Sequence, residues 1–306
     1  MTRTLKAGVA GAGVFGGYHA KKYVQLPQAA LTAVFDLDIA RARALAEPLG
    51  AAAFDDYAAF LAAVDVVTVA TPAIAHAAPA LAALRAGRHV YVEKPLAVTA
   101  DDAAQLVAQA AARGLVLAVG HQERLVFAAM GLFDIPEAPL RLEAVRLGPL
   151  SPRNLDVSTA LDLMVHDIDL GLALARDKPS WMKARGSADT LTADITFDDG
   201  FTASFQASRV APERRRTMKV VYPSGEVEID FLTRLFRNTT GFPLLEDFAD
   251  SPAGRDPLGA SVGGFLDAVL GNAPRPAVTG EEAQAALNLA LAADAVAGVE
   301  SVPTEV

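Results

Sequence analysis

Short apolar runs alternate with amphipathic, Ala-rich segments through the first 120 residues of the chain. The apolar runs have the length of buried strands, and the segments between them have the apolar spacing of helices. Strands are predicted over 7–10, 31–35, 51–54, 64–70, 89–92 and 115–119, with helices over 39–49, 57–63, 77–86 and 101–113. Such alternation is typical of a doubly wound parallel sheet, in which ligands bind beyond the carboxyl ends of the strands.

The pattern changes after Gly120. Two segments of alternating polarity flank an Asp-Gly turn within 195–205, which is a strong hairpin signal, and a second hairpin is predicted from 218–222 and 227–231. The other predicted elements are a strand over 141–147, helices over 158–176, 262–270 and 281–297, and a surface loop over 242–257. We therefore expect an α/β Rossmann domain over residues 1–120, followed by an α+β domain with a mostly antiparallel, open sheet over 121–306.

A glycine-rich turn follows the first predicted strand. Gly11, Gly13 and Gly16 fit the spacing G-x-G-x-x-G, in which the glycines allow a tight turn, the approach of a pyrophosphate and close packing of the next helix. The second strand ends in Asp36, an acid suited to accept hydrogen bonds from the adenosine ribose, although Asp36 or Asp38 could simply cap the next helix. This order of elements predicts a dinucleotide site. Because Leu37 is not a cation that could pair with a 2′-phosphate, we expect NAD rather than NADP.

The composition and charge of the chain limit the classes of partner that it can bind. The 306 residues carry a formal net charge of −9 and a pI of about 5.1, which disfavours nucleic acid or an anionic membrane as a partner. The chain has no cysteine, so neither a disulfide nor a thiolate zinc site can form, and we predict no metal. The first strand begins close to the N-terminus, and no apolar run reaches the length of a membrane span, so we expect a cytoplasmic protein.

The predicted helix over 158–176 carries an unusual polar stripe. Asp162 and His166 are four residues apart and share one helix face, and Asp169 lies one turn further on. The other positions are mostly apolar, as in a buried helix, so the polar stripe should face either a cavity or a partner. The alternatives are an ordinary solvent-facing stripe and a structural Asp–His pair. In a catalytic interpretation, Asp162 orients His166, whose imidazole is suited to proton transfer near neutral pH.

A second candidate constellation is Glu93-Lys94-Pro95, at the end of the strand 89–92. Beside a dinucleotide site, the Lys94 ammonium could polarise a substrate hydroxyl or carbonyl. The residues alone leave open whether Lys94 or His166 accepts the proton. The candidate substrate-binding residues are Gln122, Arg124, Arg153 and Asn154, although the first two could instead form hydrogen bonds between domains and loop arginines are commonly solvated.

These motifs together resemble the Gfo/Idh/MocA oxidoreductases. The resemblance rests on the glycine turn, Ala70-Thr71-Pro72, His76, the run from Ala86 to Pro95, and Asp162-x-x-x-His166. It implies NAD(P)-dependent oxidation or reduction of a sugar or cyclitol hydroxyl, with Lys94 and His166 at the reacting carbon and Asp162 in support. The cofactor-binding residues that we expect are Gly11, Gly13, Val14, Phe15, Gly16, Asp36, Thr71, Pro72, His76, Glu93 and Lys94.

The sequence departs from the family pattern at two places. Ala73 replaces an Asn that often follows the Thr-Pro pair, and Ser158-Thr-Ala-Leu161 replaces the usual glycine triplet before the Asp. The sequence from Asp162 to Leu170, preceded by Gly148–Asn154, most resembles short bacterial members of the family. Some of these act on a nucleotide sugar such as UDP-N-acetylglucosamine, at C3.

The alternatives are a myo-inositol or free aldose dehydrogenase and a non-catalytic dinucleotide-binding regulator. A regulator would need none of Lys94, Asp162 and His166, which argues against it. The resemblance also implies a homodimer or homotetramer formed through the open face of the second sheet. The sequence does not fix the sugar, the oxidised carbon or the physiological direction.

Overall fold

The computed structural model describes residues 3–151 and 155–299 and divides into two compact units. Unit 1 comprises the chain up to Gln122 together with Asp256–Gln284, and unit 2 comprises Glu123–Arg255 together with the chain from Ala285 on. The break after Gln122 lies close to the boundary expected at 120/121. The segment Asp256–Gln284 packs in unit 1, however, whereas the sequence analysis had placed it in the second domain.

Unit 1 is built on a six-stranded sheet with the order β3-β2-β1-β4-β5-β6, and all of its strand pairs are parallel. This confirms the predicted Rossmann sheet. The strands are β1 (Leu5–Ala10), β2 (Ala29–Phe35), β3 (Ala52–Phe54), β4 (Val66–Val69), β5 (His89–Val92) and β6 (Leu117–Val119). The helices before the break are α1 (Val14–Gln25), α2 (Ile39–Ala46), α3 (Tyr57–Ala62), α4 (Ala77–Arg85) and α5 (Ala100–Arg113), with short 3-10 turns η1 (Glu47–Leu49) and η2 (Ala73–Ala75).

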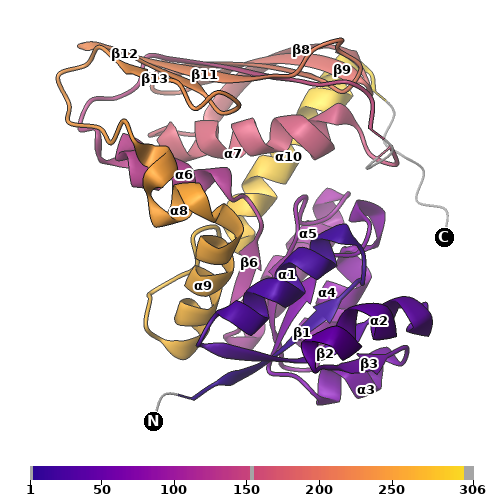
Figure 1. Ribbon diagram of the computed structural model, residues 1–306. Coiled ribbons are helices and arrows are strands. Elements are labelled where there is room, and N and C mark those ends of the chain that lie inside the picture. The colour runs from indigo at the N-terminus through magenta and orange to yellow at the C-terminus, as the bar shows by residue number, and fades with distance from the viewer. Residues whose placement is uncertain (1–2, 152–154, 300–306) are drawn as a thin grey trace. The chain divides into compact units, whose positions relative to one another are not determined.

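Helix α9 (Pro257–Leu270) explains why a late segment of the chain belongs to unit 1. It contacts α1 and β5 and buries Val262, Phe265 and Leu266 in the core that holds Tyr23 and Tyr91 (Figure 1). The Tyr91 hydroxyl also lies 2.9 Å from the Ser261 hydroxyl oxygen. The helix expected over 262–270, after a loop over 242–257, begins earlier than predicted, because Pro257 occupies the first helical position and Asp256 caps the helix.

Unit 2 is built on a seven-stranded sheet with the order β13-β12-β11-β7-β10-β9-β8. Only β7 and β10 pair in parallel, so the predicted, mostly antiparallel sheet is confirmed. The strands are β7 (Arg141–Leu147), β8 (Pro179–Ser187), β9 (Thr190–Phe197), β10 (Thr202–Ser208), β11 (Arg215–Tyr222), β12 (Gly225–Asp230) and β13 (Phe236–Asn238). The two predicted hairpins are β9–β10 and β11–β12.

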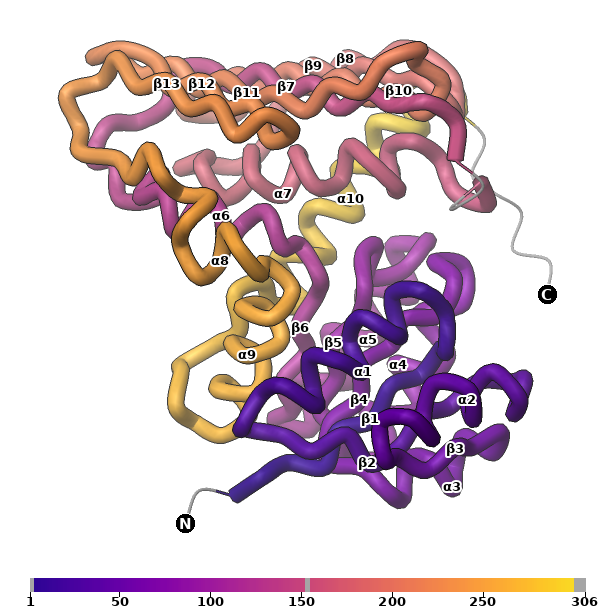
Figure 2. The backbone as a smooth tube through the Cα atoms, viewed as in Figure 1, coloured from indigo at the N-terminus to yellow at the C-terminus, as the bar shows by residue number. Residues whose placement is uncertain are grey.

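Helices cover one face of this sheet, as Figure 2 shows for α7. The Gly171 position of α7 packs close to Phe205 of β10. The helical elements of unit 2 are α6 (Glu123–Met130), η3 (Leu132–Asp134), a π-helical turn η4 (Ala160–Met164), α7 (Val165–Leu174), η5 (Phe248–Asp250) and α8 (Pro252–Arg255), and α10 (Gly280–Ala297) crosses from unit 1 into unit 2. Within the described residues, none of the helices is long and apolar enough to cross a membrane.

Candidate active site

The glycine turn of unit 1 has the backbone that a dinucleotide site needs. Gly11 has φ of +101°, and a Cβ there would lie 2.7 Å from the Ala70 carbonyl oxygen. A Cβ on Gly16 would overlap the Gly11 carbonyl oxygen. At Gly13, the N-cap of α1, a Cβ would find only Arg41 Nη2, at 3.8 Å. The start of α1 therefore combines an open approach with the positive end of a helix dipole, the arrangement that binds phosphates.

Asp36 connects the end of β2 to this turn. Its Oδ2 accepts a hydrogen bond of 2.8 Å from the Ala12 backbone N–H. Asp38, and not Asp36, caps α2, because its Oδ1 accepts the N–H of Ala40 at 2.9 Å. The capping role that competed for Asp36 is therefore filled by its neighbour, and Asp36 stands beside the glycines with Arg41 Nη2 at 3.9 Å.

His76 links the loop after β4 to the loop after β5. The side chain is buried, and its Nδ1 and Nε2 lie 2.7 Å from the Pro95 carbonyl oxygen and 2.9 Å from the Thr71 carbonyl oxygen. Burial lowers the pKa of His76, and the two backbone contacts offset this only in part. Both ring nitrogens are thus engaged by the protein, so His76 holds the two loops that carry Thr71 and Lys94.

Glu93 is likewise engaged inside unit 1. Its Oε1 lies 2.6 Å from His19 Nε2, and both side chains are buried. Burial acts to raise the pKa of Glu93, and the contact with His19 outweighs it, so the pKa is lowered. His19 is therefore the buried partner of Glu93. A Cβ on Gly120 would lie 3.0 Å from Glu93 Oε2, so that glycine leaves room for the carboxylate.

The remaining candidates of unit 1 also gather at the carboxyl ends of the strands. Lys94 is partly buried directly after β5, Thr71 donates its hydroxyl to the Ala75 carbonyl at 2.9 Å, and Pro72 is exposed. Val14 and Phe15, in the first turn of α1, are 59% and 39% exposed, which is high for apolar side chains and leaves them open to a ligand.

Unit 2 holds His166 in the first turn of α7, and its carboxylate neighbour is Glu123. His166 Nδ1 lies 2.9 Å from Glu123 Oε2, and the two side chains are 13% and 21% exposed. Glu123 begins α6, far from His166 in the sequence. Burial acts to raise the pKa of Glu123, but the charges of His166 and Arg146 outweigh it and hold the pKa well below its usual value.

Arg146 of β7 fixes this carboxylate from the other side. Its Nη1 donates to Glu123 Oε1 at 3.2 Å, while Nε and Nη2 bind the two oxygens of Asp167 at 3.0 and 2.8 Å. The guanidinium is buried, and the acids raise its pKa against the effect of burial. Asp167, Arg146, Glu123 and His166 therefore form one continuous polar chain, of which His166 is the end.

Asp162 lies in the π-helical turn that precedes α7. The single α-helix predicted over 158–176 is instead a π turn, Ala160–Met164, followed by α7. The wider π turn changes which side chains share a face with His166, because the i,i+4 rule holds for an α-helix. Such turns are frequent at functional sites. Asp162 is partly buried and is engaged in an interaction with another residue.

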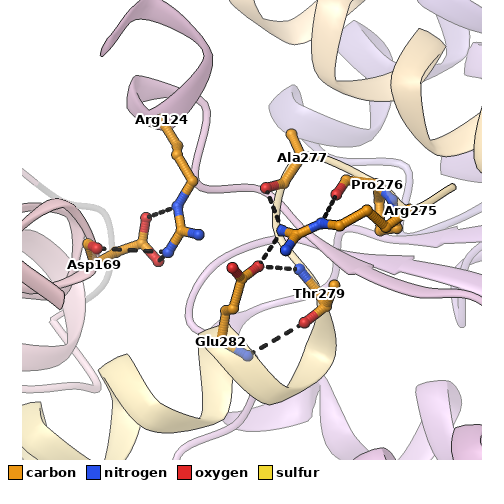
Figure 3. A network of polar contacts seen from close by, with 7 residues as sticks. All are labelled: Arg124, Asp169, Arg275, Pro276, Ala277, Thr279 and Glu282. Carbon is orange, nitrogen blue, oxygen red and sulfur yellow. Dashed lines mark hydrogen bonds and ion pairs between the residues drawn. The ribbon is translucent and has the colours of Figure 1, made fainter. Parts of the chain in front are cut away.

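Arg124 and Asp169 form a pair within unit 2, shown in Figure 3. Arg124 Nε and Nη2 donate to the two carboxylate oxygens of Asp169 at 3.0 and 2.5 Å; Asp169 is buried and Arg124 is partly buried. Asp169 is thus neutralised rather than facing a cavity. Gln122 is partly buried at the end of unit 1, whereas Arg153 and Asn154 lie outside the described residues.

The residues of unit 1 fit a bound NAD. The open N-terminus of α1 suits a pyrophosphate, and Asp36 is held where an acid can accept the ribose hydroxyls. This unit has the features of a dinucleotide-binding domain, and unit 2 holds an imidazole, His166, beside the carboxylate of Glu123. Fold and site together define a dinucleotide-dependent oxidoreductase.

Comparison with known proteins identifies the family. The model of an oxidoreductase family with an NAD-binding Rossmann fold matches residues 5–121. UDP-N-acetylglucosamine 3-dehydrogenase of Acidithiobacillus ferrooxidans is 37% identical over 284 residues, which cover 88% of this chain and 90% of that enzyme. The chain therefore belongs to the Gfo/Idh/MocA family of NAD-binding oxidoreductases, and the resemblance drawn from its motifs is confirmed.

Two solved structures extend the comparison. That of the A. ferrooxidans UDP-N-acetylglucosamine 3-dehydrogenase has a TM-score of 0.88 at 34% identity and covers 96% of this chain and 98% of its own. GenD2 from gentamicin A biosynthesis, solved in complex with NAD, has a TM-score of 0.84 at 26% identity and covers 97% of this chain and 95% of its own.

Proposed function

We propose that this NAD-binding oxidoreductase oxidises a hydroxyl of a nucleotide sugar, and that its substrate is UDP-N-acetylglucosamine, oxidised at C3. The observation that carries the proposal is the chain Arg146–Glu123–His166, which presents an imidazole backed by a fixed carboxylate. The substrate follows from the similarity to the A. ferrooxidans enzyme, which extends over most of both chains.

Oxidation of a carbinol requires the hydroxyl proton to leave while a hydride departs from the carbon. NAD, when bound, supplies the hydride acceptor. We assign its phosphates to the turn formed by Gly11, Gly13 and Gly16, and its adenosine ribose to Asp36. Val14, Phe15, Thr71, Pro72 and Lys94 complete the proposed cofactor contacts. His76 and Glu93 act indirectly, because the protein itself engages their polar atoms.

His166 is the proposed general base. The Glu123 carboxylate at its Nδ1 stabilises the imidazolium that forms when Nε2 accepts the proton. Asp162 supports the same ring from the π turn. Lys94 is the proposed electrostatic partner, whose ammonium stabilises the negative charge that develops on the substrate oxygen.

The test is the formation of NADH, followed by absorbance, with UDP-N-acetylglucosamine, free N-acetylglucosamine, myo-inositol and glucose at equal concentrations. We expect the highest kcat/KM with UDP-N-acetylglucosamine, and His166→Ala should lower kcat by roughly 10²–10⁴ while NAD binding is retained. A higher kcat/KM with myo-inositol or glucose would contradict the substrate assignment. NAD binding without turnover of any sugar would favour the regulator instead.

We also propose that the protein forms a homodimer or homotetramer through the face of the second sheet that the helices leave open. That face carries paired charges, such as Lys219 with Glu226 at 2.6 Å and with Glu228 at 3.2 Å, which suit a specific polar contact. Light scattering coupled to gel filtration tests this, and a monomer at micromolar concentration would contradict it.

A further inference from the structure

Two arginines lie directly opposite each other in the second sheet. Arg216 of β11 is in register with Arg146 of β7. Met218, Val220 and Tyr222 alternate on the same face as Arg216 and are buried, so this is the face that the helices cover. Like charges directly opposite in a sheet are destabilising, so an anion close by would relieve the repulsion between the two guanidinium groups.

The two arginines differ in their partners among the described residues. Asp167 and Glu123 bind Arg146, and the second oxygen of Glu123 is occupied by His166. Within residues 3–151 and 155–299, the Arg216 side chain has neither a hydrogen bond nor an ion pair, although it is accessible to solvent. Burial and the charge of Arg146 lower the pKa of Arg216, and the charges of Glu123 and Asp167 only partly offset this.

Arg214 extends the same positive surface. It lies two residues before Arg216, and its Cγ is 3.9 Å from the position that a Cβ on Gly148 would take, so the missing side chain leaves space for it. In the part of the chain that the structure describes, Arg214 also has no carboxylate partner. Three guanidinium groups and only two carboxylates therefore lie near His166. The cations are Arg146, Arg214 and Arg216, and the carboxylates are those of Glu123 and Asp167.

We propose that Arg216, assisted by Arg214, binds the diphosphate of the nucleotide-sugar substrate. The proposal rests on the proposed function and adds the residues that select a diphosphate. Guanidinium groups bind phosphate oxygens in a bidentate manner, and a dianionic group would neutralise the excess positive charge. The diphosphate is attached to C1 of the sugar, so an anion site close to Glu123 and His166 is consistent with oxidation of the same sugar ring.

The chain offers a matched control in Arg215. It is in register with Leu147, and side chains alternate along a strand, so Arg215 belongs to the opposite face of the sheet, where its charge acts on Asp230. Arg215→Gln and Arg216→Gln remove the same charge from adjacent positions. Only Arg216→Gln removes it from the proposed site.

The experiment is calorimetric titration of UDP, and of uridine, into the full-length protein saturated with NAD, so that the dinucleotide site is filled. We expect Arg216→Gln to weaken UDP binding about 10- to 100-fold, Arg214→Gln to weaken it less, and Arg215→Gln to stay within about twofold of wild type. Uridine binding should not depend on Arg216. In turnover, Arg216→Gln should raise KM for the UDP-sugar more than it lowers kcat.

The outcomes separate this inference from the proposed function. UDP binding that depends on Arg216, without turnover of UDP-N-acetylglucosamine, would support the diphosphate site and contradict the proposed reaction. Turnover with an unchanged KM in Arg216→Gln would overturn the diphosphate site and leave the reaction intact. A purely structural Arg216 would lower the melting temperature on substitution without changing UDP affinity. We expect the melting temperature to stay the same or rise, because the change removes a like-charge contact.

Discussion

Replacing Glu123 with Gln tests the polar chain that ends at His166. The amide keeps the shape of the side chain and can still accept a hydrogen bond from Arg146, which also keeps both contacts with Asp167. The main loss is the negative charge 2.9 Å from His166 Nδ1. An ion pair that is partly shielded from water contributes about 1.5–3 kcal/mol, between the values for an exposed pair and a fully buried one.

The expected effect on catalysis follows from that magnitude. The carboxylate stabilises the imidazolium, which forms as His166 accepts the proton, so its loss raises the barrier. A loss of about 1.5–3 kcal/mol corresponds to a decrease in kcat of about 10- to 100-fold. Binding of NAD should be unchanged, because the residues proposed to hold it lie in unit 1 and Glu123 begins unit 2. Steady-state kinetics with saturating NAD measures kcat, and titration of NAD into the two proteins measures cofactor binding.

The pH dependence of stability provides a second readout. The folded-state pKa of Glu123 is depressed, so its ionised form stabilises the protein above the unfolded-state pKa of about 4.3. This contribution is lost as the pH falls below that value toward the folded-state pKa. The difference in free energy of unfolding between wild type and Glu123→Gln should therefore be largest near neutral pH and should shrink in acid. Urea unfolding at several pH values measures it.

Glu143→Gln is the matched control, since Glu143 pairs with Arg141 at 2.9 Å on the surface, where the two side chains are 47% and 53% exposed. Such a pair contributes about 0–1 kcal/mol, and kcat should not change. The reasoning would be refuted if Glu123→Gln kept wild-type kcat in a protein that His166→Ala inactivates.

Three further predictions concern unit 1. Asp36→Ala combined with Leu37→Arg should shift the cofactor preference toward NADP, since it removes a repelling carboxylate and adds a cation; tighter binding of NADPH than NADH by the wild type would contradict the argument. Gly16→Ala should destabilise the protein by more than about 2 kcal/mol, because its Cβ would overlap the Gly11 carbonyl, whereas Gly264→Ala in α9 is a control in helical backbone with no atom within 4 Å of the added Cβ; equal melting temperatures for the two variants would refute this. Lys94→Ala should lower kcat at least as much as His166→Ala, and Lys94→Arg should not restore it, because the larger planar guanidinium does not replace a compact ammonium; full activity of either variant would exclude Lys94 from the reaction.

Much of unit 1 could be predicted because its signals are local. The buried parallel strands are short apolar runs in the sequence. The glycine turn directly follows the first strand, and Asp36 directly follows the second. The packing of Asp256–Gln284 in unit 1 could not be predicted. Helix α9 is apolar, but nothing in its sequence indicates which surface of the protein it packs against. Strand β8 was missed for a different reason: most of its side chains are exposed, so it has no apolar alternation.

The structure adds a residue to the candidate site. His166 was proposed from its place in an apolar helix, with Asp162, four residues earlier, as its supporting carboxylate. The structure shows the Glu123 carboxylate beside His166 Nδ1, where the packing of α6 against α7 places it. The spacing of residues along the chain does not indicate a contact between residues as far apart in the sequence as Glu123 and His166. The opposition of Arg146 and Arg216 was equally hidden, since it depends on the register between β7 and β11.

The most direct test of the central claim is transfer of the substrate hydride to NAD. UDP-N-acetylglucosamine carrying deuterium at C3 should give singly deuterated NADH, detected by mass spectrometry, and should react more slowly than the unlabelled sugar when hydride transfer limits a single turnover. The same sugar labelled at C4 should give unlabelled NADH. Deuterium transferred from C4, or from neither carbon, would contradict oxidation at C3.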